Sequence, residues 1–103
     1  MNKLLQALAL CRRAGKLSLG FDPAWEAAES GKAALLICSA CLSDNTKKEI
    51  WFLSSQTGLP LIEVPATLDE LWYILGKRVG VLAVTDPSLA RKVEEAAALE
   101  PER

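Results

Sequence analysis

Apolar residues recur along this chain in two alternating patterns, one helical and one typical of strands. Leu4, Leu8 and Cys11 are spaced at i, i+4 and i+7, which predicts an amphipathic helix over residues 2–14. Similar patterns, with polar or Asp-Pro starts, predict four further helices at 22–30, 44–56, 67–75 and 87–99. Short apolar runs bounded by glycine, proline or polar residues predict strands at 17–19, 33–38, 59–64 and 79–84.

Two of the predicted helix starts carry recognisable capping signals. Asp22 is expected to be an N-cap, with Pro23 at the first helical position, where a missing N–H costs nothing. Thr67 and Glu70 form a capping box, in which each side chain satisfies a backbone N–H of the other. The helix that follows carries an apolar stripe at i, i+3, i+4 and i+7, made of Leu68, Leu71, Trp72 and Leu75.

The order of the elements predicts the fold class. The run at 33–38 is apolar throughout, which is typical of a strand buried on both faces, as strands of parallel sheets are. Strands that alternate with helices predict an α/β protein, a three-layer α/β/α sandwich with a mixed, largely parallel four-stranded sheet. A length of 103 residues is enough for one hydrophobic core, so we expect a single domain over residues 1–103.

Charge is unevenly distributed along the chain, although the net charge is only −1. Residues 1–50 carry seven Lys or Arg against five Asp or Glu, whereas residues 51–103 carry five against eight. This balance permits nucleic-acid binding at a local patch but not over the whole surface. No apolar run is long enough to span a membrane, and the N-terminus lacks a signal-peptide pattern, so we expect a cytoplasmic protein with no membrane partner.

Candidate catalytic chemistry is sparse. The chain has no histidine, and its acidic pairs are explained by helix starts or solvated faces, so we expect no enzyme, no cofactor and no metal site. Cys38 and Cys41 form a C-x-x-C pattern, which permits dithiol redox chemistry. The alternative is structural: Cys38 ends a buried strand, and Cys41 lies in a loop that precedes the next helix start.

Basic residues flank two predicted turns. Arg12, Arg13 and Lys16 precede the turn at Gly20 and Phe21, and Lys77 and Arg78 precede Val79. If the two turns converge at one end of the sheet, they form a groove in which cations contact phosphate, a helix N-terminus reads base edges and Val79 supports an unstacked base. The alternative is an ordinary solvated face.

An ordered series of short segments resembles the kink-turn RNA-binding ribosomal protein family (L-seven-Ae / L-thirty-e), and most closely its bacterial YlxQ-like branch. The series covers nearly the whole chain: Ala14-Gly15-Lys16-Leu17-Ser18-Leu19-Gly20, Ser30-Gly31-Lys32-Ala33, Leu35-Leu36-Ile37, Asn45-Thr46-Lys47-Lys48, Leu61-Ile62-Glu63-Val64, Glu70-Leu71, Leu75-Gly76-Lys77 and Val84-Thr85-Asp86.

The resemblance implies a small non-catalytic RNA-binding protein, ribosome-associated, that recognises kinked or structured RNA through the Gly20 turn, the start of the second helix and the loop before the last strand. The implied partners are RNA, with the ribosome or other proteins. The expected RNA-binding residues are Arg12, Arg13, Lys16, Gly20, Phe21, Asp22, Lys32, Lys77, Arg78 and Val79.

The chain departs from the family pattern at the centre of this site. Where the family commonly has Gly-x-Asn-Glu, the chain has Gly20-Phe21-Asp22-Pro23, and Glu26 stands near a position often held by Lys. An ionised Asp only accepts hydrogen bonds, whereas Asn also donates them. The alternative function is therefore a protein-interaction module of the same fold that has lost kink-turn binding, with Trp25 or Trp51 as an anchor.

Overall fold

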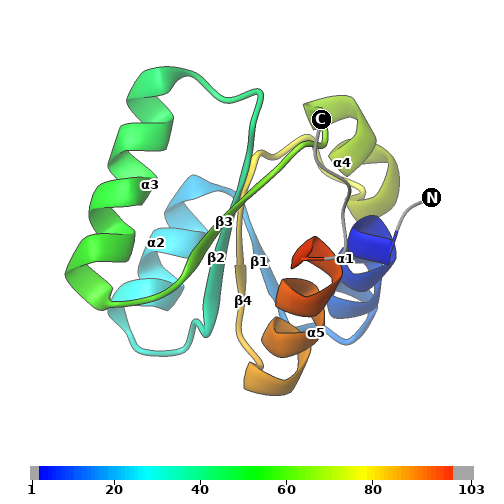
Figure 1. Cartoon of the computed structure of the whole chain (residues 1–103), viewed down its shortest axis with the longest axis horizontal. Helices are drawn as coiled ribbons and strands as arrows, with labels where there is room; N and C mark the ends of the chain where they lie inside the picture. The colour runs from blue at the N-terminus through cyan, green and yellow to red at the C-terminus, as the bar shows by residue number, and fades with distance from the viewer. Residues whose placement is uncertain (1–2, 99–103) are drawn as a thin grey trace.

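The computed structural model describes residues 3–98, and within them the predicted order of helices and strands is confirmed (Figure 1). Residues 2 and 99, predicted to begin the first helix and end the last, lie outside the described residues. The elements are α1 (Lys3–Arg13), β1 (Leu17–Leu19), α2 (Phe21–Glu29), β2 (Leu35–Ser39), α3 (Asp44–Thr57), β3 (Leu61–Val64), α4 (Leu68–Leu75), β4 (Val81–Val84) and α5 (Pro87–Ala98).

The four strands form one mixed sheet in the order β1-β4-β2-β3. The predicted "largely parallel" pairing is wrong, because β4 runs antiparallel to both β1 and β2 and only β2 and β3 pair in parallel. The error has a physical cause. An apolar run shows that helices cover both faces of a strand, but the connections set its direction. The chain leaves β3 and enters β4 at the same edge of the sheet, so α4 is not a parallel crossover.

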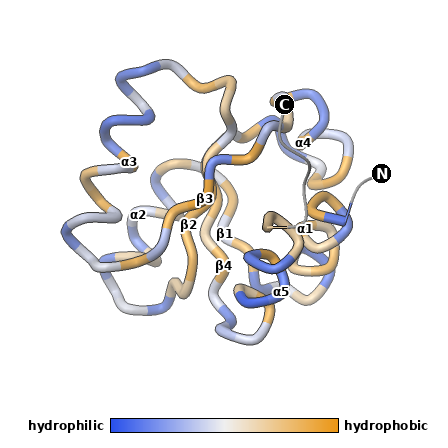
Figure 2. The backbone as a smooth tube through the Cα atoms, in the orientation of Figure 1, coloured by the Kyte–Doolittle hydropathy of each residue, from blue (hydrophilic) through white to orange (hydrophobic). Residues whose placement is uncertain are grey.

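Helices cover both faces of the sheet, which confirms the three-layer architecture. One core cluster joins α1, α4 and α5 to the sheet and includes Leu35 and Ile37 of β2. The other joins α2 and α3 to the opposite face and includes Leu36 and Cys38. Side chains of β2 thus alternate between two buried surfaces, and Figure 2 shows hydrophobic residues concentrated along the central strands.

The helix ends show how far the local signals hold. The Thr67–Glu70 capping box is present, with Thr67 N–H donating to Glu70 Oε1 over 2.8 Å and Glu70 N–H to Thr67 Oγ1 over 3.1 Å. Ser43 is the N-cap of α3. The predicted apolar stripe on α4 is only partly right, because Leu71 and Leu75 are buried but Trp72 is 54% exposed.

Candidate nucleic-acid interface

Four loops meet at one edge of the sheet. Because β1, β2 and β3 all run antiparallel to β4, their carboxyl ends lie where β4 begins. Two backbone hydrogen bonds fix this arrangement: Gly20 N–H donates to the Val81 carbonyl over 2.9 Å, and Ser39 N–H donates to the Gly80 carbonyl over 2.8 Å. The turn at Gly20 and loop 76–80 therefore lie at the same sheet edge, so the condition set for a shared groove is met for these two turns.

The start of α2 differs from the prediction. The helix begins at Phe21, and its N-cap is Gly20, with φ of 109° and no side-chain capping hydrogen bond. Asp22 is exposed in the first turn and is not the N-cap, so that prediction is wrong. The positive φ explains why glycine occupies the cap. Pro23 still lies within the first turn, where its missing N–H removes no helical bond, and the N–H groups of Phe21 and Asp22 point out of the helix start.

Loop 76–80 is tightly packed. Val79, which precedes Gly80, is half-buried against the core cluster of α1, α4 and α5. A Cβ atom on Gly80 would lie 2.5 Å from Cδ2 of Leu42 and 2.8 Å from Cδ2 of Leu68, so only glycine fits there without movement of a neighbour. The loop backbone is therefore held close to the β2–α3 loop.

Three of the predicted cations lie at or beside this loop. Lys77 and Arg78 are exposed within it. Arg78 Nη1 pairs with Asp69 Oδ1 over 2.7 Å, and both side chains remain more than half exposed. Arg12 Nε donates to the Leu75 carbonyl over 3.2 Å, which brings the end of α1 beside the end of α4. These cations therefore border one side of the interface.

The structure does not bring every predicted residue to this edge. Lys16 precedes β1, and its carbonyl accepts a hydrogen bond from Thr85 N–H at the far end of β4. Lys32 precedes β2 at that same far edge, where Ala34 N–H donates to the Val84 carbonyl. Arg13 ends α1 with an exposed side chain. The expectation of a single groove that includes Lys16 is therefore wrong. Lys16 lies at the start of β1 and the Gly20 turn at its end, so the length of the strand separates them.

The cysteines do not form a reactive pair. Cys38 is fully buried, and burial, followed by the nearby Glu63 charge, raises the pKa of its thiol to about 11. Cys41 is exposed. A thiol with so high a pKa is protonated at neutral pH and is a poor nucleophile, which disfavours the dithiol alternative. Among residues 3–98 no group of three or more His, Cys, Asp or Glu side chains is placed to hold a metal ion.

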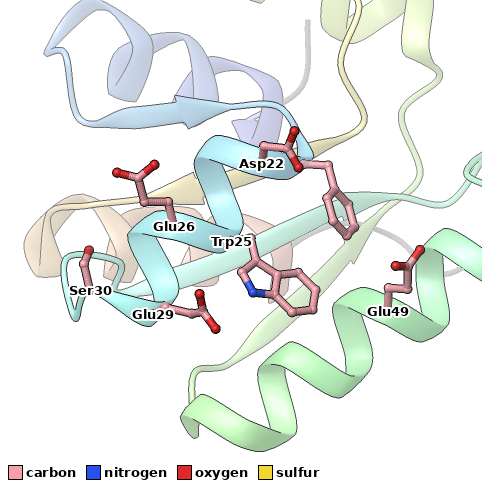
Figure 3. A pocket seen from close by; sticks show the side chains of 7 residues that line it. Asp22, Trp25, Glu26, Glu29, Ser30 and Glu49 are labelled. Atoms are coloured by element: carbon pink, nitrogen blue, oxygen red, sulfur yellow. The ribbon is translucent and has the colours of Figure 1, made fainter.

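Sequence reasoning missed one feature beside this interface. The rings of Phe21 and Trp25 lie 5.4 Å apart, centroid to centroid, and both residues line one hollow together with Glu49 of α3. Figure 3 shows Trp25 between the two helices, with Glu49 of α3 nearby. The i, i+4 spacing of the two aromatic residues was the available signal, but the contribution of α3 depends on tertiary packing.

No model of a known protein family matches the chain. Among curated proteins, it is 29% identical over 94 residues to the RNA-binding protein YlxQ of Enterococcus faecium, covering 91% of this chain and 90% of that protein. It is also 24% identical over 86 residues to the large ribosomal subunit protein eL30 of Aeropyrum pernix, covering 82% of this chain and 86% of that protein.

Two solved structures share the fold. One is a protein of unknown function from Bacillus halodurans, with a TM-score of 0.89 and 26% identity over 95% of this chain and 99% of that one. The other is the 15.5kD RNA binding protein of Giardia lamblia, with a TM-score of 0.75 over 93% of this chain and 82% of that one. At 18% identity, the second shows the fold alone.

The sheet order and the helix layers are shared with the solved structures, and the curated relatives match most of the chain. These similarities support the family predicted from the sequence, the L-seven-Ae / L-thirty-e proteins. The similarity to a YlxQ protein supports the predicted YlxQ-like branch of that family. In the part of the chain that the structure describes, every helix is too short or too polar to cross a membrane.

Proposed function

We propose that this chain is a small non-catalytic RNA-binding protein, ribosome-associated and cytoplasmic, that recognises kinked or structured RNA. The site is the sheet edge formed by Gly20, the start of α2 and loop 76–80. The observation that carries the proposal is the pair of backbone hydrogen bonds that hold these two loops at one edge. Relatives named as RNA-binding and ribosomal proteins support the same assignment.

The geometry supplies complementary contacts for RNA. The N–H groups at Phe21 and Asp22 donate from the positive end of a helix dipole to phosphate or base oxygens. Lys77 and Arg78 contact phosphates from the adjacent loop, with Arg12 behind them. Val79 packs beneath an unstacked base. In this arrangement cations position the RNA backbone, and the helix start and Val79 contact the bases.

The acidic side chains of α2 limit the affinity. Asp22 and Glu26 are both exposed on the first turns of the helix, where they repel a nearby phosphate. Pro23 offers no backbone donor. In the variant D22N/P23E/E26K, which carries the family's commoner types, D22N removes one repulsive charge and E26K replaces another by a cation. P23E restores a backbone donor and adds one carboxylate acceptor. We expect kink-turn binding to strengthen by about tenfold or more, since one polar contact is worth roughly 1–3 kcal/mol.

The test is binding to a labelled kink-turn RNA and to an unkinked duplex, over a salt series from about 50 to 200 mM. We expect tighter binding to the kinked RNA. The variant K77A should bind about threefold to tenfold less tightly, with a shallower salt slope. K92A, which removes a lysine from α5, is the matched control and should bind normally. Equal weakening by K77A and K92A, or unchanged affinity in the triple variant, would contradict the proposed site.

The second candidate is a protein-interaction module of the same fold that has lost kink-turn binding. The observation in its favour is aromatic exposure on α3, where Trp51 is 56% and Phe52 is 57% exposed. Trp25, the other anchor considered, is half-buried and therefore less exposed than Trp51 and Phe52. Absence of binding to both RNAs at about 50 mM salt would favour this module over the RNA-binding protein.

A further inference from the structure

A hollow of about 620 Å³ lies between α2 and α3, beside the RNA-binding edge (Figure 3). Its floor is aromatic: the rings of Phe21 and Trp25 lie 5.4 Å apart with their planes tilted by 32°. Its lining comes from both helices and consists of Phe21, Asp22, Trp25, Glu26, Glu29, Ser30 and Glu49. The hollow therefore combines a partly exposed indole face with carboxylates.

The charge of the hollow is uncompensated. Four of its seven lining residues are acidic, and none is basic. Across residues 3–98 the ion pairs within 4.0 Å are Lys47–Glu63 and Arg78–Asp69, so none of these four carboxylates is paired. Four unpaired charges in one place, on a chain with a net charge of −1, create a local negative potential. That potential attracts cations and repels the phosphates of RNA.

The chemistry of the lining selects among cations. The carboxylates are spread around an aromatic floor and, among the described residues, are not gathered as metal ligands. An arginine guanidinium suits both components, because its planar face stacks on indole and its edge donates hydrogen bonds to carboxylates. Glu29 and Glu49 reach the hollow from α2 and α3, so a guanidinium above Trp25 would have acceptors from both helices.

We propose that this hollow is the docking site for an arginine-bearing basic segment of a partner protein. Such a segment complements the four carboxylates in charge and the Phe21–Trp25 pair in shape. The hollow adjoins the RNA-binding edge at Phe21 and Asp22. The acidic lining repels RNA phosphates, so RNA binds on the side of loop 76–80 and the basic segment binds between α2 and α3. In this arrangement the chain joins an RNA to a basic protein.

The experiment uses the full chain and a fluorescein-labelled hexa-arginine peptide, with binding followed by fluorescence anisotropy. Hexa-lysine and hexa-glutamate peptides serve as comparison probes. The variant E29Q/E49Q removes two carboxylates from opposite sides of the hollow while keeping side-chain size. Its matched control is E94Q/E95Q on α5, which makes the same charge change on the other face of the sheet.

We expect hexa-arginine to bind more tightly than hexa-lysine, and hexa-glutamate not to bind. E29Q/E49Q should weaken hexa-arginine binding about fivefold, since two exposed charge contacts are lost, while E94Q/E95Q binds normally. The variant W25L should weaken it about threefold through loss of cation–π contact, and W72L, at an exposed tryptophan of α4, should not.

Equal weakening by the two glutamine pairs would overturn the proposal, because it would show only a general attraction to an acidic protein. Equal affinity for hexa-arginine and hexa-lysine, or normal binding by W25L, would remove the aromatic component and also overturn it. If W25L fails to fold, the variant E29Q/E49Q still tests the proposal, because it changes only exposed side chains. Kink-turn RNA binding by E29Q/E49Q is measured separately, so failure of the hollow is distinguishable from failure of the RNA site.

Discussion

Gly80 is the point at which the packing of the proposed RNA site can be tested most sharply. Its φ is not positive, so an alanine fits the backbone, and the substitution Gly80→Ala changes only the space available. The new Cβ would lie 2.5 Å from Leu42 Cδ2 and 2.8 Å from Leu68 Cδ2. Real contacts between such carbon atoms are about 3.5–4.0 Å long. The two leucine side chains must therefore move, or loop 76–80 must shift away from the β2–α3 loop.

The expected size of the effect follows from two opposing contributions. Overpacking of this kind costs about 1–3 kcal/mol. Replacing glycine by alanine lowers the conformational entropy of the unfolded chain, which stabilises the folded state by about 0.4–1 kcal/mol. The net loss of unfolding free energy is then about 1 kcal/mol, which lowers Tm by roughly 4–8 °C in a domain of this size. Urea unfolding of the wild type and the variant measures it directly.

The double variant Gly80→Ala with Leu42→Ala identifies the cause. Removing the Leu42 side chain removes the closest contact, so the added cost of alanine at position 80 should be smaller in that background, with the 2.8 Å contact to Leu68 remaining. Kink-turn RNA binding should weaken in the single variant, because the loop that carries Val79 moves. A Gly80→Ala protein as stable as the wild type, or an equal cost in both backgrounds, would refute the steric reasoning.

Two further predictions concern charge and protonation. The variant D69N frees Arg78 from its 2.7 Å ion pair, so kink-turn RNA binding should strengthen about twofold to threefold. The free energy of unfolding should change by less than about 1 kcal/mol, because the pair is exposed. Weaker RNA binding would contradict a phosphate contact by Arg78. Burial raises the pKa of Cys11 and of Cys38 to about 11, from 9.0. The unfolded chain therefore loses these protons first, and the urea midpoint should fall as pH rises from 9 towards 11. A Cys38→Ala variant should show a shallower fall, and an identical slope would contradict the assignment.

Local signals in the sequence predicted most of the fold. The capping box at Thr67 and Glu70 and the buried strand around Ile37 depend on residues close together in the chain, and each is present. Asp22 was misassigned as the N-cap because an Asp-Pro pair is compatible with several positions of a first helical turn. Gly20 is the N-cap instead, and its φ is positive. Trp72 continued the apolar stripe on α4, yet its side chain is 54% exposed.

The candidate site depended more on long-range structure. The sequence allowed convergence of the Gly20 turn with loop 76–80 but could not establish it, because it depends on the strand directions, which were partly wrong. Lys16 was assigned to the same groove because it is close in sequence to Gly20, but β1 carries the chain from one edge of the sheet to the other. The aromatic hollow was missed because Glu49 joins Trp25 only when α3 packs beside α2.

The most direct test of the account is an NMR titration of the isotopically labelled full chain with a kink-turn RNA. The account predicts that the amide signals of Gly20, Phe21 and Asp22, and those of residues 77–81, shift together at one RNA equivalent. Signals of Lys16, Lys32 and α5 should stay in place. Shifts centred on the far edge of the sheet, or on α3 and α5, would contradict the proposed RNA-binding edge.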